Sequence, residues 1–524
     1  MKKTNLCIFL FSLVLISATG CKKTFEDNFK NPNQPEEVPP NLVFISILKS
    51  MYEAPFSDAE RWGQYTACNY FYYGNNRYDW TGSPYWQNDY INLKNVSKME
   101  EEANRTGGDV AKSYLALAKF FKAYFYVRLS LQVGDVPMSE AIKGSENLSP
   151  KYDTQKAVFT QALTWLDEAN TDLAAAIASG TASLQGDIYL GNDLSKWQKA
   201  VNTFHLRVLI ALSRKSDDND LQVKQQFAAI VGNTGKYPIQ TGMGDNVQFV
   251  YNDTFDKYPN NRDNFGFDAL RFNMAGTYIG ALTALKDPRV FVVAEPARGL
   301  AERNGYALTD FRSFVGSSSG EDQAIMSEKA QTGLYSFINR FKYYSGYQAE
   351  ETFIIGYPEL CFNIAEGINR GWANGNAEDW YRKGIQASIA FYDIKDGENT
   401  VTFLRKDGVL GQYENYTVNF NFANYYSQTP VKYAGNNTQG LQQILTQKYL
   451  AFARNSGYEA YYQYRRTGIP AFQTGPGTGN SGRIPKRFQY PTVERTTNGT
   501  NLQSALASQY NGTDDINATP WIVQ

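Results

Sequence analysis

Histidine is nearly absent from this chain, because only His205 occurs among the 524 residues. Zinc sites of the HExxH type need two histidines, and a Ser-His-Asp triad needs a histidine base, so one histidine argues against both. His205 has apolar neighbours in a predicted helix, which favours a structural role. Asp217–Asp220 clusters oxygen ligands but lacks the glycine and distal glutamate of a calcium-binding hand loop, so we expect a solvated turn there. The sequence predicts no metal and no cofactor.

An excess of basic residues is also missing. Lysine and arginine total 51, aspartate and glutamate total 52, and the formal net charge is −1. Proteins that bind nucleic acid neutralise phosphates with a basic surface, so nucleic acid is not a predicted partner.

Cysteine is scarce, with four residues in the chain. Cys7 and Cys21 lie near the N-terminus, which leaves Cys68 and Cys361 for the body of the protein. These two either pair in an oxidising compartment or remain isolated buried thiols, and the sequence leaves both alternatives open.

Long apolar runs are confined to the N-terminus. Lys2 and Lys3 precede the run Leu6–Ile16, which is shorter than the ~20 apolar residues that span a bilayer. This pattern predicts that residues 1–20 are a signal peptide removed after export.

The residues that follow the apolar run indicate a lipid anchor. Small residues lead directly to Cys21, and this ending resembles a bacterial lipoprotein signal, in which the cysteine is acylated and becomes the new first residue. An ordinary secretory signal with a chance cysteine is the alternative. Residues 21–40 are polar and rich in proline, which predicts an anchor and an extended tether.

Aromatic residues are abundant, with 37 Tyr, 32 Phe and 8 Trp, and helical periodicity dominates the chain. Apolar residues recur every three or four positions from Tyr114 to Leu129, and Val158–Ile177 is a second amphipathic helix. A third helix, Ser195–Ser213, begins with Ser195 and Gln198 in the spacing of a capping box. The composition and periodicity predict a mainly α protein.

A helical hairpin is predicted around position 370. Pro358 suits the first turn of one helix, and Gly371–Asn376 forms the connection to the next. Residues 41–524 are expected to form a single α domain with a loop-rich insertion at about 232–346. Within that insertion, Val247–Tyr251 and Val290–Val293 have the pattern of short strands.

Six segments resemble motifs of one family and occur in the family's order. They are Asn31–Pro35, Ala118–Pro137, Asp193–Leu212, Tyr357–Trp372, Glu459–Pro470 and Arg483–Pro491. On these motifs the chain resembles the SusD/RagB family of outer-membrane nutrient-binding lipoproteins of Bacteroidetes.

The resemblance implies a fold, a location and partners. The fold is a superhelix of tetratricopeptide-like helical hairpins with an irregular, loop-rich part that faces the ligand. The protein would be anchored by lipid in the outer membrane, face the exterior, and bind glycan without catalysis. It would deliver this cargo to a SusC-like TonB-dependent outer-membrane barrel. Capture of peptide, as in RagB-like members, is the alternative within the family.

The segment from Tyr70 to Trp86 is the predicted ligand site. Sugars bind to flat aromatic rings through their C–H faces and to amide, carboxylate or guanidinium groups through their hydroxyls. Packing of these rings on the helices is the structural alternative. Tyr343 and Tyr344 are weaker candidates from the central region. The predicted ligand-binding residues are Trp80 and Trp86 as platforms, with Tyr73, Arg77 and Asp79.

Two functions outside the binding class stay open at this stage. A secreted glycan hydrolase would use a pair of carboxylates, and 52 acidic residues supply many pairs without singling one out. A structural envelope protein would bind no small ligand at all.

Overall fold

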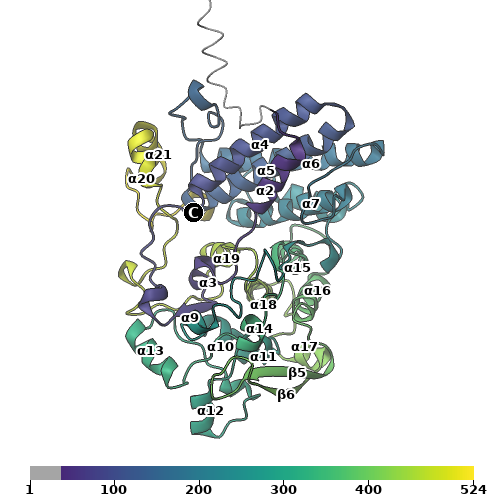
Figure 1. The fold of residues 1–524 in the computed structure, drawn as a ribbon. Helices are drawn as coiled ribbons and strands as arrows, with labels where there is room; N and C mark the ends of the chain where they lie inside the picture. Colours follow the sequence, from purple (N-terminus) through teal and green to yellow (C-terminus); the bar gives the residue numbers. More distant parts are fainter. Residues whose placement is uncertain (1–36) are drawn as a thin grey trace, which may run out of the picture.

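The computed structural model describes residues 37–524 (Figure 1). The predicted signal peptide, the acylated Cys21 and most of the predicted tether lie outside the described residues. From residue 37 onward, no helix has both the length and the apolar character that crossing a bilayer requires.

The upper half of the molecule in Figure 1 is a layer of long helices. Consecutive helices of this layer pack against each other as hairpins. Its helices are α2 (Pro40–Lys49), α4 (Trp86–Thr106), α5 (Gly108–Val133), α6 (Gln155–Ser179), α7 (Leu194–Ala211) and α8 (Val223–Gly232).

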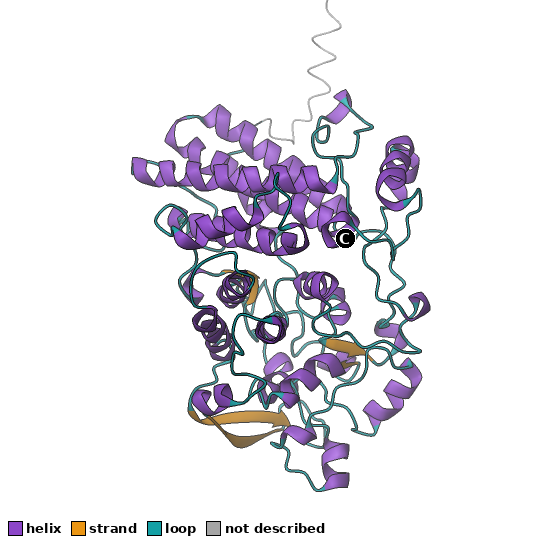
Figure 2. Cartoon of the chain, turned by 180° about the vertical axis from the view of Figure 1, so that it is seen from behind, coloured by secondary structure: helices purple, strands orange, loops and turns teal. Residues whose placement is uncertain are grey.

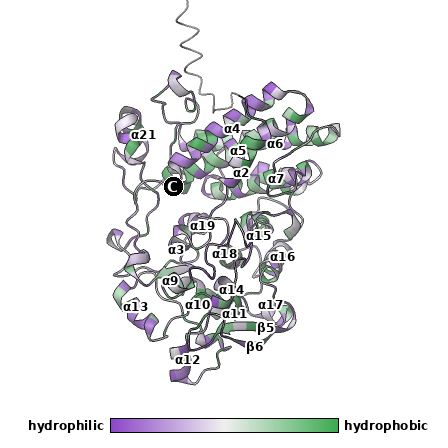
Figure 3. Cartoon of the chain, in the orientation of Figure 1, coloured by the Kyte–Doolittle hydropathy of each residue, from purple (hydrophilic) through white to green (hydrophobic). Residues whose placement is uncertain are grey.

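Helix α5 is the centre of this layer. Every residue from Ala123 to Val133 is buried, so the helix is enclosed on all sides, as expected for a helix that is apolar all round. Figure 3 shows the contrast between α5, which is largely hydrophobic, and the hydrophilic α12 (Arg298–Asn304) at the opposite end of the molecule.

The lower half combines three longer helices with short elements and loops. The longer helices are α15 (Tyr357–Asn369), α16 (Ala377–Ala390) and α18 (Thr438–Ala451). The short helices include α3 (Asp58–Trp62), α9 (Phe265–Asp268), α10 (Gly276–Ala284), α11 (Val290–Val293), α13 (Gln323–Gln331), α14 (Arg340–Tyr344), α17 (Phe422–Ser427) and α19 (Glu459–Thr467). Near the C-terminus, α20 (Thr492–Thr497) and α21 (Gly499–Tyr510) follow.

The strands form three separate antiparallel pairs. β1 (Thr66–Cys68) pairs with β3 (Phe272–Met274), and β2 (Val247–Phe249) pairs with β4 (Thr352–Ile355). The longest pair is the hairpin of β5 (Gly397–Leu404) and β6 (Tyr413–Phe420), which is prominent in Figure 2.

A buried ion pair joins the two halves. Arg207 on α7 donates to Glu359 on α15, with Nε–Oε1 and Nη2–Oε2 distances of 2.7 and 2.5 Å. Within the lower half, Arg466 on α19 donates to Glu366 on α15 in the same two-pronged way. A buried guanidinium needs such pairing, because an unpaired charge in the interior is costly. These arginines lie in segments that carry the family motifs.

Several sequence predictions about local structure are confirmed. The hairpin at position 370 is formed by α15 and α16, and Pro358 lies in the first turn of α15. Cys68 and Cys361 are both free and buried, which decides against a disulfide between them. Burial raises the pKa of the Cys361 thiol to about 12.

Two local predictions are wrong. The N-cap of α7 is Asp193 rather than Ser195, because the Asp193 carboxylate accepts hydrogen bonds from the N–H groups of Ser195 and Lys196. Val290–Val293 is a helical turn, α11, and not a strand. A run of four apolar residues fits either structure, and only the surrounding packing decides between them.

Candidate functional site

An exposed group of aromatic rings lies on the loop that follows β1. We define the aromatic cluster as Tyr70, Phe71, Tyr72 and Tyr73, the last three of which form a short 3₁₀ helix, η1. The side chains of Tyr70, Phe71 and Tyr72 are 45%, 77% and 83% exposed. Large apolar rings are rarely left so open, and a contiguous group of them marks a binding surface.

The loop that carries the cluster is held at both ends. The buried Asn76 side chain accepts a hydrogen bond from the Cys68 N–H at 2.7 Å and donates one to the Cys68 carbonyl at 2.9 Å. Gln323 on α13 donates to the carbonyls of Cys68 and Gly74. Gly74 has a φ of +137°, and a Cβ there would lie 2.7 Å from Arg61, so the turn requires glycine.

Residues of α9 and of the short segment between α9 and β3 extend this surface. The Arg271 guanidinium lies 4.6 Å from the centroid of the Tyr70 ring and 6.0 Å from that of Tyr73. Asn69 binds the backbone here, donating through its N–H to the Arg271 carbonyl. Phe267 and Leu270, on and just after α9, are 67% and 51% exposed. The surface thus combines apolar faces with a cation, which suits a ligand that has C–H faces and oxygen atoms.

Trp80 does not have the exposed ring face that the sequence-based assignment requires. It is 5% exposed and stacks on Phe488, with ring centroids 4.2 Å apart and planes 8° from parallel. Trp62 and Tyr461 also contact it, with centroids 4.8 Å away in both cases. The structure therefore corrects the platform assignment, because core rings cover this indole.

Trp86 is corrected for the same reason. It opens α4, is 5% exposed, and packs against Tyr90 and Tyr490 with centroid distances of 5.1 and 5.7 Å. Tyr343 and Tyr344 are also core residues, with 1% and 0% exposure. For these four residues the structural alternative is the right one.

Arg77 and Asp79 are exposed, and they form an ion pair with each other. Asp79 Oδ1 also accepts a hydrogen bond from the Asn480 N–H at 2.6 Å, which anchors the glycine-rich loop near the C-terminus. This backbone hydrogen bond, with help from Arg77, lowers the pKa of Asp79 below its usual value. Of the five predicted residues, Tyr73 alone belongs to the aromatic cluster, where its ring is partly exposed.

The predicted segment does carry exposed rings, but they are not the two tryptophans that the sequence favours. Phe71 and Tyr72 are the most exposed rings of the run, while Asn76, Tyr78 and Trp80 alternate as buried positions. That alternation over 76–80 is the period of an extended strand with one face on the core, and it was visible in the sequence. Arg271 was not detectable, because strand pairing brings it to the loop from far along the chain.

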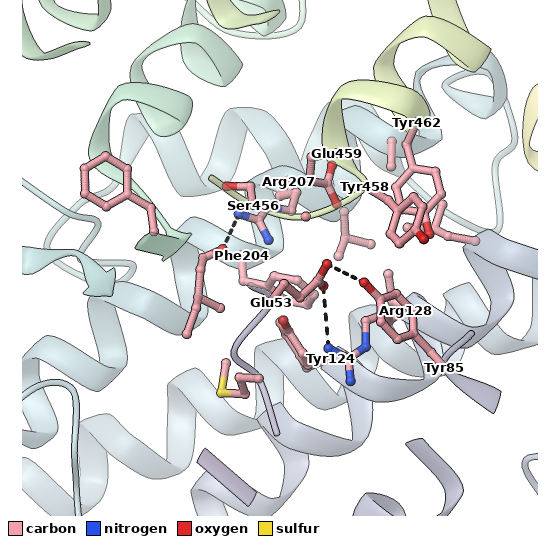
Figure 4. A pocket seen from close by; sticks show the side chains of 18 residues that line it. Glu53, Tyr85, Tyr124, Arg128, Phe204, Arg207, Ser456, Tyr458, Glu459 and Tyr462 are labelled. Atoms are coloured by element: carbon pink, nitrogen blue, oxygen red, sulfur yellow. Dashed lines mark hydrogen bonds and ion pairs between the residues drawn. The ribbon is translucent and has the colours of Figure 1, made fainter. Parts of the chain in front are cut away.

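A small cavity lies between the two halves (Figure 4). Its volume is about 40 Å³, and Glu53, Arg128, Arg207 and Glu459 are among its lining residues. Tyr85 donates a hydrogen bond to Glu53. This volume accommodates a few water molecules, whereas sites for small ligands measure roughly 300–1,000 Å³. The cavity is therefore too small to hold a glycan.

The acidic turn at Asp217–Asp220 is neutralised by lysines. Lys156 Nζ lies 2.9 Å from Asp218 and 2.7 Å from Asp220, and Lys224 pairs with Asp217. Over residues 37–524, no group of three or more His, Cys, Asp or Glu is arranged to hold a metal ion. The buried His205 donates or accepts one hydrogen bond with Gln226, and burial lowers its pKa to about 4.

Comparison with protein families decides the identity of the fold. Residues 32–491 match the model of a SusD-like family described as starch-binding and associating with the outer membrane. The chain belongs to the SusD-like family. This confirms the family and the mainly α fold class that the sequence motifs predict. A comparison with curated proteins returned no match.

Solved structures of SusD homologues resemble this protein over nearly its whole length. A SusD homologue from Bacteroides fragilis is 29% identical, with a TM-score of 0.79, covering 93% of this chain and 100% of its own. An outer-membrane protein from Bacteroides vulgatus, whose description refers to nutrient binding, is also 29% identical, with a TM-score of 0.77 and the same coverage. A chitin-binding SusD homologue from Flavobacterium johnsoniae is 20% identical, with a TM-score of 0.70, covering 93% of this chain and 98% of its own; it shares the fold.

Proposed function

We propose that this SusD-like protein is a cell-surface lipoprotein that captures oligosaccharide or polysaccharide at the aromatic cluster and performs no catalysis. The observation that carries the proposal is the exposure of Phe71 and Tyr72, at 77% and 83%, on a loop whose backbone is tied down. The family description as starch-binding and the chitin-binding relative support a glycan as the ligand.

The cluster offers the groups that a sugar ring requires. Tyr72 and Tyr73 stand edge to face, with centroids 5.3 Å apart, so their planes form a corner in which one face of a pyranose can stack. Arg271 and the tyrosine hydroxyls supply donors at the rim for sugar hydroxyls. Arg77 follows the aromatic cluster closely in sequence. Asp79 acts mainly by accepting a hydrogen bond from Asn480, which holds the glycine-rich loop near the C-terminus.

The proposal includes a membrane anchor and a transporter that receives the glycan. Acylation at Cys21 would anchor the protein in the outer membrane, facing the exterior, and a SusC-like TonB-dependent barrel would receive the glycan. Co-purification with a large outer-membrane barrel, and mass spectrometry of the N-terminal peptide for acylation, test these two parts separately from ligand binding.

The binding site is tested by Phe71→Ala and Tyr72→Ala. Each variant should bind glycan about tenfold more weakly, because a stacking surface is lost while the core is untouched. Affinity electrophoresis through gels with soluble starch or glycol chitin measures the effect. Leu148→Ala is the matched control, because Leu148 is also 77% exposed but lies outside the cluster. If the glycan retards both cluster variants as strongly as the wild type, this site is ruled out. If the protein binds peptides and no glycan, the RagB-like alternative is favoured.

A further inference from the structure

A second, larger groove lies beside the β5–β6 hairpin. Its volume is about 900 Å³, within the range of known ligand sites, and elements α11, α14 and α17 contribute to its lining together with both strands. In Figures 1 and 2 the hairpin and α13, which holds the loop of the aromatic cluster, lie on opposite sides of the lower half. The groove is therefore separate from the cluster.

One edge of the hairpin opens into this groove. The N–H of Arg405, just after β5, bonds to the carbonyl of Gln412, just before β6. The backbone N–H and carbonyl groups of the odd-numbered residues of β5 therefore point toward β6, and those of the even-numbered residues point away from it, toward the free edge. Consistent with this, the outward carbonyl of Thr402 accepts from Asn339, and the outward N–H of Leu404 donates to Glu295. Within residues 37–524, the outward N–H and carbonyl of Thr400 bond to no other group.

Several side chains at the groove have unused hydrogen-bonding capacity. Thr400 and Thr417 face each other across the hairpin, and Asn419 lies on the same face. In the described part of the chain, the polar side-chain atoms of these three residues and of Asn424 take part in no hydrogen bond, and all four residues are exposed. Phe341, which is 40% exposed, adds a ring at the same groove.

We propose that this groove is a second glycan-binding site, which rests on the proposed function for its ligand class. Hydroxyls, amides and one open ring match a polyhydroxylated chain. The charged residues of the lining, Lys286, Lys342 and Asp393, include both signs, and Lys342 lies 3.6 Å from Glu350, so the groove has no strong preference for a charged ligand.

A peptide that binds as an additional strand along the edge of β5 fits less well. The side chains of Asn339 and Glu295 already hydrogen-bond to the edge groups of Thr402 and Leu404, next to Thr400. Two separated sites let one long polysaccharide bind at both, which raises its affinity above that of a short oligosaccharide.

The first test uses the variants Phe341→Ala and Asn419→Ala/Asn424→Ala in affinity electrophoresis. Retention by soluble starch or glycol chitin should fall about fivefold, the effect of losing one or two hydrogen bonds or a stacking ring. Binding of maltoheptaose or chitohexaose measured by calorimetry should change less, because the aromatic cluster is intact. Thr429→Ala serves as the control, since Thr429 is exposed and close in sequence to α17 but does not line the groove. If the polysaccharide gels retain both groove variants as strongly as the wild type, the proposal is overturned.

Hydrogen exchange with and without chitohexaose or maltoheptaose separates this inference from the proposed function. Protection of residues 397–404 and 70–74 together is the expected result. Protection of 70–74 alone overturns the groove and keeps the function. Protection of 397–404 alone supports the groove and overturns the cluster as the capture site. Absence of protection in both, or protection of 397–404 only by a casein peptide digest, overturns the second glycan site.

Discussion

Trp80 and Phe488 stack face to face, with ring centroids 4.2 Å apart, and so join the loop after the aromatic cluster to a segment near the C-terminus. This contact assigns Trp80 to the core. It also reverses the effect that the sequence predicts for a mutation of this residue, because a platform ring affects binding whereas a core ring affects stability.

Trp80→Ala should lower the free energy of unfolding by about 3–5 kcal/mol, as large-to-small changes of a buried aromatic ring do. The folded fraction should keep most of its glycan affinity, since the ring faces the core. Urea denaturation and calorimetry check the two parts, with Trp80→Phe as the conservative variant that should lose less stability. Loss of binding at unchanged stability would contradict the structure and restore the platform role.

Arg271 should contribute to binding through its contact with Tyr70. Removing the guanidinium in Arg271→Ala takes away a cation–π contact of about 0.5–1 kcal/mol and a donor at the rim. We expect the affinity for chitohexaose or maltoheptaose to fall about fivefold with little change in Tm. Arg312→Ala is the matched control, because Arg312 lies 4.3 Å from the centroid of the Tyr306 ring outside the cluster. Equal affinities of the two variants would exclude a role for Arg271.

Glu459 should make stability depend on pH. Burial, which Arg207 only partly offsets, raises its pKa from 4.5 to about 7. In the window between these values the folded state holds a proton that the unfolded state has released, so stability falls as pH rises from about 4.5 to 7. The loss is on the order of 3 kcal/mol.

The variant Glu459→Gln isolates this effect. Glutamine resembles the protonated acid, so the variant should differ little from the wild type near pH 4 and unfold at a higher temperature at pH 8. Scanning calorimetry at both pH values measures the difference. Glu146→Gln is the control, because Glu146 is exposed on the surface and its variant should follow the wild type at both values. A pH-independent difference for Glu459→Gln would contradict the assignment.

The sequence predicts the helices better than the site. Periodicity locates α6 and α7 because each buries an apolar face, which requires apolar residues at spacings of three and four. The central helix α5 is buried on all sides, and its apolar residues follow the same spacing from Tyr114 to Leu129. The prediction fails at α7's first turn, where Asp193 precedes the expected cap by two positions and accepts hydrogen bonds from the N–H groups of Ser195 and Lys196. Both carboxylate and hydroxyl serve as caps, so composition alone does not choose between them.

The binding surface depends on contacts that no local pattern contains. Phe71, Tyr72 and Trp80 are all aromatic residues in one run, and their difference arises from Phe488, which covers one ring and leaves the others open. The position of Arg271 depends on the pairing of β3 with β1. Residue types therefore identify the segment, while tertiary packing decides which of its side chains meet the solvent.

The two hydrogen bonds between Asn76 and Cys68 have a kinetic consequence. A loop that is already closed has no folding step to complete when cargo arrives, so encounter should be rapid and similar for all glycans that fit. Differences among cargoes should then appear in how long each one stays, which sets how often a captured chain is released before it is handed over.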